Sequence, residues 1–245
     1  MLMLFRRLLS LGLLICAALS NLEAQESNKP ISARDIDFSA FVKETQQQPN
    51  EPGYAGLVWW IPTQFWELSA QRSGVPEDRA EQRYEPLRKY TVVAVALGKI
   101  GVGNINWVSE PDIRDNVLLR DSEGNTYPAV QKLSGDAEGL SSILKPVFAN
   151  ILGAMGQNIQ LLFFPATNKM AKPIADPLAD GSFSIVISNV LGGKQTTFEW
   201  KLPLTNLSLP KYCPLGKERV QANWKYCPWH GVSLDPEASV PPKMK

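Results

Sequence analysis

Short runs of apolar, β-branched and aromatic residues, each closed by a turn signal, recur along the middle of this 245-residue chain. The clearest are YAGLVWWI at 54–61, YTVVAVAL at 90–97 and SFSIVISNVL at 182–191. Runs of this length and composition are typical of β-strands. Most connections between them carry no helical period, which argues against a parallel α/β sheet. The run count, about eight, favours a mainly β fold made of antiparallel sheets.

One of these runs also shows which face of its strand is buried. In TTFEWKLPL, Phe198, Trp200 and Leu202 alternate with Glu199 and Lys201. Alternation with a period of two places the apolar side chains on one side of a sheet and the charged ones on the other. We therefore expect an antiparallel β-sandwich. Its pattern fits an immunoglobulin-like arrangement, although the Cys–Trp–Cys signature of antibody domains is missing.

A single long segment has the period of a helix. Apolar residues at 140, 143, 144, 147, 148, 151 and 152 form one stripe at helical spacing. Gly153 and Gly156 are natural C-terminal stops, and Pro146 is expected to kink the helix or to mark its first turn. The prediction is one inserted helix within the sandwich. A shorter helix is expected over TQFWELSAQ, with Thr63 as its N-cap.

The N-terminal 24 residues have the layout of a secretory signal peptide. Arg6 and Arg7 precede an apolar run at 8–19, and small residues follow. The run is too short to span a bilayer, and cleavage is expected after Ser20 or Ala24. The alternative is an N-terminal membrane anchor that is never cut. The prediction is an exported protein that is periplasmic or secreted.

Composition divides the remainder of the chain into four parts. Residues 25–53 are polar and rich in Gln, Asn and Pro, which predicts a tether, with one helical turn in IDFSAFV that docks on the body. Residues 54–208 are assigned to the β-sandwich and 209–235 to a small C-terminal module. Residues 236–245 are expected to form a disordered tail.

The charge balance limits the classes of partner. Removing residues 1–24 leaves 23 basic and 23 acidic residues, so the mature chain is neutral. Without a net positive charge or a Lys/Arg block, binding to nucleic acid and electrostatic attachment to anionic membranes lack their usual driving force. No second apolar stretch reaches transmembrane length. The expected partner is another protein or a component of the cell envelope.

The C-terminal stretch CPLGKERVQANWKYCPWHG, from Cys213 to Gly231, holds two Cys-Pro turns and the only histidine of the chain. It resembles a degenerate bacterial zinc ribbon, in which two Cys-Pro-x-Cys-Gly knuckles are separated by about ten residues that end in Trp-Lys-Tyr. The resemblance covers about twenty residues. His230 stands where the fourth Cys of that pattern would be, and Gly216 stands where the second Cys should be.

The resemblance implies a zinc site with Cys213, Cys227 and His230 as ligands. A structural zinc ion needs four ligands, so the fourth is expected from Glu218, Asp235, Glu237 or water. The alternative is a disulfide between Cys213 and Cys227, the only cysteines left after residue 24. Closing a loop of about 15 residues would stabilise the module by roughly 3 kcal/mol in the chain-entropy model. Free thiols are the third possibility.

Tryptophans provide a second set of candidate site residues. Trp60, Trp66 and Trp107 lie in or beside predicted strands. Such large aromatic side chains belong in the hydrophobic core, or they form an exposed platform for a sugar ring or a partner protein. The sequence leaves both interpretations open.

Few patterns in the sequence point to catalysis. His230 is the sole histidine, and neither a G-x-S-x-G motif nor a phosphate-binding Gly-rich loop is present. The leading hypothesis is therefore an exported, non-enzymatic β-sandwich that serves as an interaction or structural module of the cell envelope. The alternatives are a carbohydrate- or other ligand-binding module that uses exposed tryptophans, and a zinc protein or zinc-dependent hydrolase centred on the C-terminal knuckles.

Overall fold

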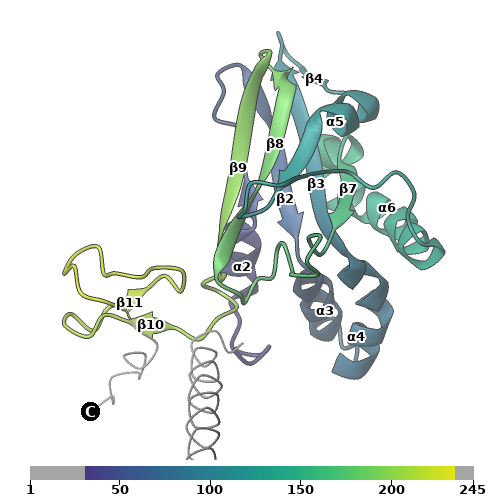
Figure 1. The fold of residues 1–245 in the computed structure, drawn as a ribbon. Helices are drawn as coiled ribbons and strands as arrows, with labels where there is room; N and C mark the ends of the chain where they lie inside the picture. Colours follow the sequence, from purple (N-terminus) through teal and green to yellow (C-terminus); the bar gives the residue numbers. More distant parts are fainter. Residues whose placement is uncertain (1–30, 235–245) are drawn as a thin grey trace, which may run out of the picture.

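The computed structural model describes residues 31–234. It contains a five-stranded sheet, a four-stranded sheet and a small two-stranded sheet, and all of their strand pairs are antiparallel (Figure 1). The predicted mainly β, antiparallel class is therefore confirmed. The small sheet belongs to the C-terminal module, which lies apart from the body in Figure 1.

The five-stranded sheet is organised around its long strand β3. Its strands are β1 (Gln46–Gln47), β2 (Tyr54–Ile61), β3 (Tyr90–Ile100), β4 (Ile105–Trp107) and β7 (Gln160–Pro165). β2 pairs along one edge of β3. On the other edge, β7 pairs with residues 90–95 and β4 with residues 98–100. The apolar run of β3 thus lies at the centre of the sheet, and six consecutive residues from 92 to 97 are buried.

The four-stranded sheet has the order β6-β5-β8-β9. Its strands are β5 (Val117–Arg120), β6 (Thr126–Pro128), β8 (Gly181–Leu191) and β9 (Lys194–Leu202). The turn Asp121–Asn125 joins β5 to β6, as the hairpin signal in the sequence predicts. On β9, Phe198, Trp200 and Leu202 are buried while the charged residues between them are exposed, which confirms the predicted alternation.

The two large sheets share one hydrophobic core. Trp60 from β2, Phe183 from β8 and Trp200 from β9 meet at its centre, with ring centroids 4.8–6.4 Å apart. Trp60 and Phe183 contact edge to face, whereas Phe183 and Trp200 are stacked. These aromatic contacts fix the two sheets against each other because each ring fills space that the facing sheet leaves open.

The opposite face of the five-stranded sheet carries a second core, which helices cover. Trp59 and Phe163 project from β2 and β7 toward Trp66 and Phe148. The helices of the described residues 31–234 are α2 (Phe38–Glu44), α3 (Thr63–Arg72), α4 (Glu77–Tyr84), α5 (Glu110–Asn116), α6 (Gly135–Gln157) and the 3-10 helix η2 (Glu85–Lys89). Helix α3 confirms the shorter helix expected from the sequence, although Pro62 and not Thr63 is its N-cap. The expectation of a single inserted helix besides it is wrong, because the outer face of the central sheet is apolar and residues of α3, α4 and α6 cover it.

Helix α6 buries two of the seven residues in its predicted apolar stripe and partly buries two more, Leu140 and Leu152. Leu144 and Phe148 are buried against the sheet, whereas Ile143, Val147 and Ile151 are exposed. Residues four apart form one row along a helix, and a helix lying on a sheet buries the row that faces it. Pro146 lies inside the helix, and the break in helical geometry is at Gly153, with φ 56° and ψ −132°.

The described part of the predicted tether is packed into the body. Helix α2 buries Phe41 completely, and the helical turn predicted in IDFSAFV is confirmed. Thr45 then accepts a hydrogen bond from Trp59 through its hydroxyl (3.0 Å) and one from Trp200 through its carbonyl (3.1 Å). The polar composition of this segment thus conceals a structural element, because its few apolar and capping residues are enough to hold it.

Several sequence predictions concern residues outside the described range. They are the signal peptide at 1–24 with its cleavage sites, the possible ligands Asp235 and Glu237, and the tail at 236–245. Among the helices at residues 31–234, none combines the length and the apolar character needed to cross a bilayer.

Candidate metal centre

The C-terminal module, residues 209–234, is built around a very small core. Strands β10 (Lys211–Tyr212) and β11 (Arg219–Val220) form its hairpin. Its hydrophobic cluster consists of Cys213, Val220, Cys227 and Leu234. The backbone N–H of Ala222 donates to the Thr205 hydroxyl (3.2 Å), and the Asn223 amide donates to the Lys201 carbonyl (3.3 Å). Two polar contacts thus join the module to the body beside strand β9.

Each Cys-Pro sequence forms the same turn. The N–H of Lys217 donates to the Cys213 carbonyl (2.9 Å), and the N–H of Gly231 donates to the Cys227 carbonyl (2.8 Å). Lys217 and Gly231 have nearly equal positive φ values, 62° and 65°. The next residue of each turn, Glu218 or Val232, accepts a hydrogen bond from the N–H of the cysteine that begins it. The two knuckles are therefore structural repeats, although their sequences differ.

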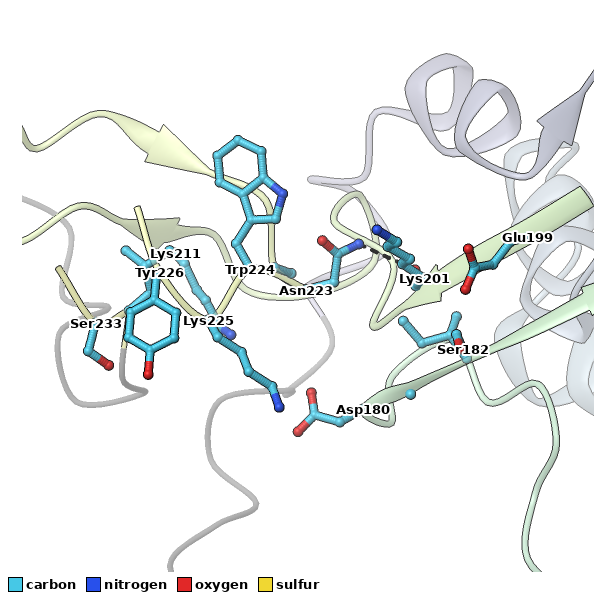
Figure 2. A pocket seen from close by; sticks show the side chains of 14 residues that line it. Asp180, Ser182, Glu199, Lys201, Lys211, Asn223, Trp224, Lys225, Tyr226 and Ser233 are labelled. Atoms are coloured by element: carbon cyan, nitrogen blue, oxygen red, sulfur yellow. Dashed lines mark hydrogen bonds between the residues drawn. The ribbon is translucent and has the colours of Figure 1, made fainter. Parts of the chain in front are cut away.

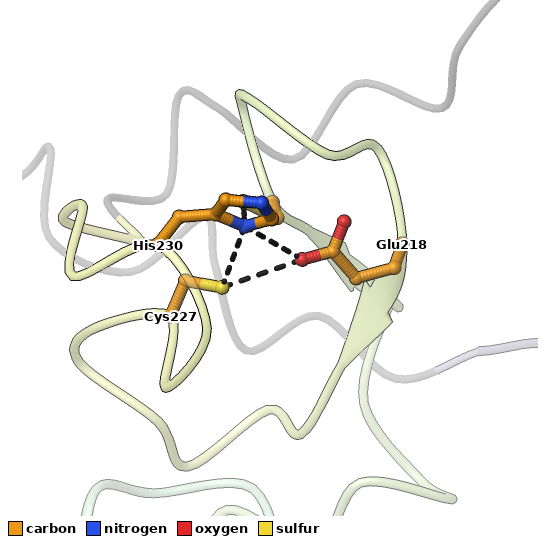
Figure 3. Close-up of side chains that lie close together, drawn as sticks. Glu218, Cys227 and His230 are labelled. Atoms are coloured by element: carbon orange, nitrogen blue, oxygen red, sulfur yellow. Dashed lines mark hydrogen bonds and ion pairs between the residues drawn. The ribbon is translucent and has the colours of Figure 1, made fainter.

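The knuckles bring four potential ligands together. Figure 3 shows Glu218, Cys227 and His230 converging on one point, and Cys213 completes the group. His230 Nδ1 lies 3.3 Å from Cys213 Sγ, 3.4 Å from Cys227 Sγ and 3.1 Å from Glu218 Oε1. All four ligand atoms lie within 4.8 Å of one another. The structure thus unites the three predicted metal ligands, and of the proposed fourth ligands it brings Glu218 to them.

Four of these spacings are close to the edges of a zinc coordination tetrahedron. Bond lengths of about 2.3 Å to sulfur and about 2.0 Å to nitrogen or oxygen place tetrahedral ligand atoms roughly 3.3–3.8 Å apart. The four contacts within the cluster are 3.1–3.4 Å long, including 3.3 Å between Cys227 Sγ and Glu218 Oε1. Two thiolates, one imidazole and one carboxylate suit a divalent zinc ion.

The carboxylate of Glu218 fills the space left by the missing cysteine. A β-carbon at Gly216 would collide with Glu218 Oε2 and would lie 2.6 Å from His230 Cε1. Gly216 occupies the place of the second cysteine in the zinc-ribbon pattern. The absence of a side chain at 216 therefore allows the longer side chain of Glu218, two residues further along, to enter the cluster.

Burial and hydrogen bonding divide the cluster into two halves. Cys213 and Cys227 are buried, whereas the His230 and Glu218 side chains are 38% and 31% exposed. Burial is the main cause that raises the pKa of the Cys227 thiol, although the N–H groups of Trp229 and His230 act in the opposite direction. The pKa of Glu218 is lowered, first by its own backbone N–H and further by the two thiols and His230.

The disulfide alternative is not what the structure contains, because both cysteines are free. Both sulfurs instead point into the four-residue cluster, where each contacts His230 Nδ1. Sequence spacing alone could not separate the two outcomes, since the same facing knuckles serve a metal site and a disulfide equally well.

Two of the three candidate tryptophans take the core position, which is one of the two interpretations that the sequence leaves open. Trp60 is 1% exposed in the first core, and Trp66 is 5% exposed in the second. Trp107 is partly buried and packs against the second core. The exposed aromatic side chains are instead Tyr226 and Trp229 of the C-terminal module. The sequence signal for them was their position beside the knuckle cysteines, where a small module has no core to bury them.

A cavity of about 730 Å³ lies where the module meets strands β8 and β9 (Figure 2). Both signs of charge line it, with Asp180 and Glu199 from the body and Lys225 from the module. Figure 2 shows the Lys225 and Asp180 side chains extending toward each other across it. None of the four cluster residues lines this cavity, so it is separate from the candidate metal centre.

No protein-family model matches this chain, and neither a curated protein nor a solved structure matches it. The candidate metal centre therefore stands on its own geometry.

Proposed function

We propose that the C-terminal module binds one zinc ion through Cys213, Glu218, Cys227 and His230. The observation that carries this proposal is the convergence of four ligand atoms of suitable chemistry within 4.8 Å of one another. The resemblance to a zinc ribbon supports it, because the two knuckles also share their turn geometry.

The role of the zinc ion is structural. All four positions of the tetrahedron are supplied by side chains, which is the closed arrangement of structural zinc sites. The module has only four buried residues in its core, and two of them are the cysteines themselves. A core of this size does not supply enough apolar burial to order about 26 residues, so metal binding provides the missing stabilisation.

For the whole protein, we propose an exported, non-enzymatic role as an interaction or structural module of the cell envelope. The signal-peptide pattern at residues 1–24 supports export. The two packed sheets support a scaffold role, since the aromatic side chains of the body fill its cores. The small module then adds a metal-stabilised surface to this scaffold.

Metal analysis of purified chain 25–245, which includes every described element, tests the zinc site. We expect one zinc ion per chain, and we expect Co²⁺ to replace it with the visible absorption of a tetrahedral cobalt–thiolate centre. The variant Cys227→Ser should lose both signals. A protein purified under reducing conditions that contains no stoichiometric zinc and takes up none would overturn the proposal.

The fourth ligand is tested separately. Glu218→Gln should keep the cobalt–thiolate absorption but lower zinc affinity by about 10- to 100-fold, because a charged ligand becomes neutral. The matched control is Glu81→Gln, which changes an exposed carboxylate on α4 and should leave affinity unchanged. Equal zinc affinity in Glu218→Gln and the unmodified chain would remove Glu218 from the site and leave Asp235, Glu237 or water as the fourth ligand.

A further inference from the structure

The tips of the two knuckles expose apolar side chains at equivalent positions. Leu215 and Trp229 each follow a Cys-Pro pair by one residue, and each is 64% exposed. Exposed large apolar side chains on so small a module are available for contact with a partner or a membrane.

These two side chains project from neighbouring parts of the backbone. Gly216, which follows Leu215, lies against His230, which follows Trp229: a β-carbon at 216 would be 2.6 Å from His230 Cε1. The Trp229 ring is held edge to face against Trp224, with centroids 5.7 Å apart. The residues that follow the two tip residues thus meet at the four-residue cluster. We call Leu215, Lys217 and Trp229 the knuckle-tip patch.

The charge around this patch has one sign. The exposed Lys, Arg, Asp and Glu residues of the described module are Lys217, Arg219 and Lys225, all of them basic. Residues 209–234 contain four basic residues against one acidic residue, Glu218. Bound zinc would leave this charge balance unchanged, because its two positive charges are cancelled by the negative charges of the two cysteine thiolates. By contrast, residues 31–208 carry 16 basic and 19 acidic residues. The overall neutrality of the chain conceals a separation of charge between module and body.

Ile31, at the N-terminal end of the described residues, lies beside the start of this module. The N–H of Ile31 donates to the Leu207 carbonyl (3.1 Å), two residues before the module begins. Residues 20–30 link this point to the apolar run at 8–19. Fully extended, such a link of 11 residues spans at most about 40 Å. A bilayer that holds the run, before cleavage or in an uncut chain, is therefore within reach of the module.

We infer that the knuckle-tip patch docks on the headgroup region of an anionic lipid bilayer. Leu215 and Trp229 enter the interface, where tryptophan is favoured, and the exposed Lys217 and Arg219 face the negatively charged headgroups. The combination of exposed apolar tips and basic residues beside them fits a lipid surface better than a nucleic acid, whose backbone offers nothing apolar to Leu215. The same surface serves the chain after cleavage.

Co-sedimentation of zinc-loaded chain 25–245 with lipid vesicles tests this inference. We expect binding to phosphatidylcholine vesicles that contain about 30 mol% phosphatidylglycerol, weaker binding to pure phosphatidylcholine, and a decrease with added salt. The double variant Leu215→Ser/Trp229→Ser should bind at least about tenfold more weakly. Lys217→Gln should weaken binding about fivefold on the anionic vesicles only.

Matched controls come from the body. Ile151→Ser removes an apolar side chain that is 71% exposed on α6, and Lys132→Gln removes an exposed charge; neither should change vesicle binding. Zinc content is measured for every variant, so loss of the metal centre is distinguished from loss of the docking surface. Equal binding of the unmodified chain and the Leu215→Ser/Trp229→Ser variant, with zinc retained, would overturn the inference. Retention of an oligonucleotide or a protein, with no vesicle binding, would also overturn it.

Discussion

The carboxylate of Glu218 lies against Gly216 and occupies the space that a β-carbon at position 216 would take. The two residues act as a pair: one gives up its side chain, and the other uses the space to reach Cys227 Sγ and His230 Nδ1, at 3.3 and 3.1 Å. A cysteine missing from the zinc-ribbon pattern is thus compensated by a carboxylate from the same knuckle. The pairing leads directly to a prediction about position 216.

Gly216→Ala should weaken zinc binding although Gly216 is not itself a ligand. The added methyl group forces the Glu218 carboxylate away and crowds His230, but it supplies no ligand of its own. We expect an affinity loss comparable to that of Glu218→Gln, about 10- to 100-fold, measured by competition with a chelator.

Gly216→Cys separates steric from chemical effects, because its thiol supplies a ligand where the cluster loses Glu218. It should bind zinc at least as tightly as the unmodified chain, and adding Glu218→Gln to it should then have little further effect. The control is Gly139→Ala, whose β-carbon meets nothing within 4 Å. If Gly216→Ala binds zinc normally, Glu218 does not depend on the space beside Gly216.

Zinc and a disulfide should exclude each other at Cys213 and Cys227. Both thiols are buried and both contact His230 Nδ1, so bound zinc keeps them from an external oxidant. After chelation, a small-molecule disulfide can accept the two electrons: its S–S bond breaks into two thiols as the Cys213–Cys227 bond forms. We expect intact-mass analysis to show this bond only in the chelated sample. Equally fast oxidation with zinc bound would contradict the prediction.

The sequence was most informative where side chains repeat with a clear period. The alternation of Phe198, Trp200 and Leu202 with charged residues identified strand β9 and its buried face. The same reasoning could not decide whether Trp60 and Trp66 are buried. Trp59 and Trp60 are adjacent in β2 and point to opposite faces of the sheet, and the sequence does not show which face is covered. Only the packing of two sheets and a helical layer shows that both faces of β2 are covered.

The metal site shows a similar limit. The knuckle pattern pointed to Cys213, Cys227 and His230, and the resemblance indicated their chemistry. The fourth ligand needed the three-dimensional relation of Gly216 to Glu218, since Glu218 does not occupy a pattern position. The helical stripe of α6 was identified with its correct period, but its burial depends on how the helix lies on the sheet, which the period alone does not specify.

The two rows of this stripe should therefore differ in their contribution to stability. Leu144→Ala or Phe148→Ala leaves a cavity against the five-stranded sheet and should lower the free energy of unfolding by about 2–5 kcal/mol. Ile143→Ala and Ile151→Ala change side chains that are 57% and 71% exposed, and should stay within about 0.5 kcal/mol of the unmodified chain. Urea unfolding followed by tryptophan fluorescence measures this difference. Similar losses in both rows would mean that a partner or a second copy covers the exposed row.

Asp121 should make the β5–β6 turn sensitive to acid. Its carboxylate accepts hydrogen bonds from the N–H groups of Glu123 (3.0 Å) and Asn125 (2.8 Å), the Asn125 amide and the Tyr127 hydroxyl (2.8 Å). Burial alone would raise the pKa of Asp121, but these hydrogen bonds, with those from Asn125 and Tyr127 foremost, outweigh it and lower the pKa. The folded chain therefore binds the Asp121 proton more weakly than the unfolded chain does.

The sign of the pH dependence follows from this lowered pKa. The contribution of ionised Asp121 to stability is complete above the ordinary aspartate pKa of about 3.9, and it is lost as the pH falls through the lower folded value.

Asp121→Asn should unfold more easily than the unmodified chain at pH 7, by about 1–2 kcal/mol, because an amide cannot accept the same set of hydrogen bonds. The gap should narrow as the pH falls below the ordinary aspartate pKa and through the lower folded pKa, because the unmodified chain then loses the same contribution. Asp115→Asn, at an exposed position on α5, is the control and should show no gap at neutral or acidic pH. A gap for Asp121→Asn that stays constant down to pH values at which the unmodified chain unfolds would show that the turn is held by the shape of the side chain and not by its charge.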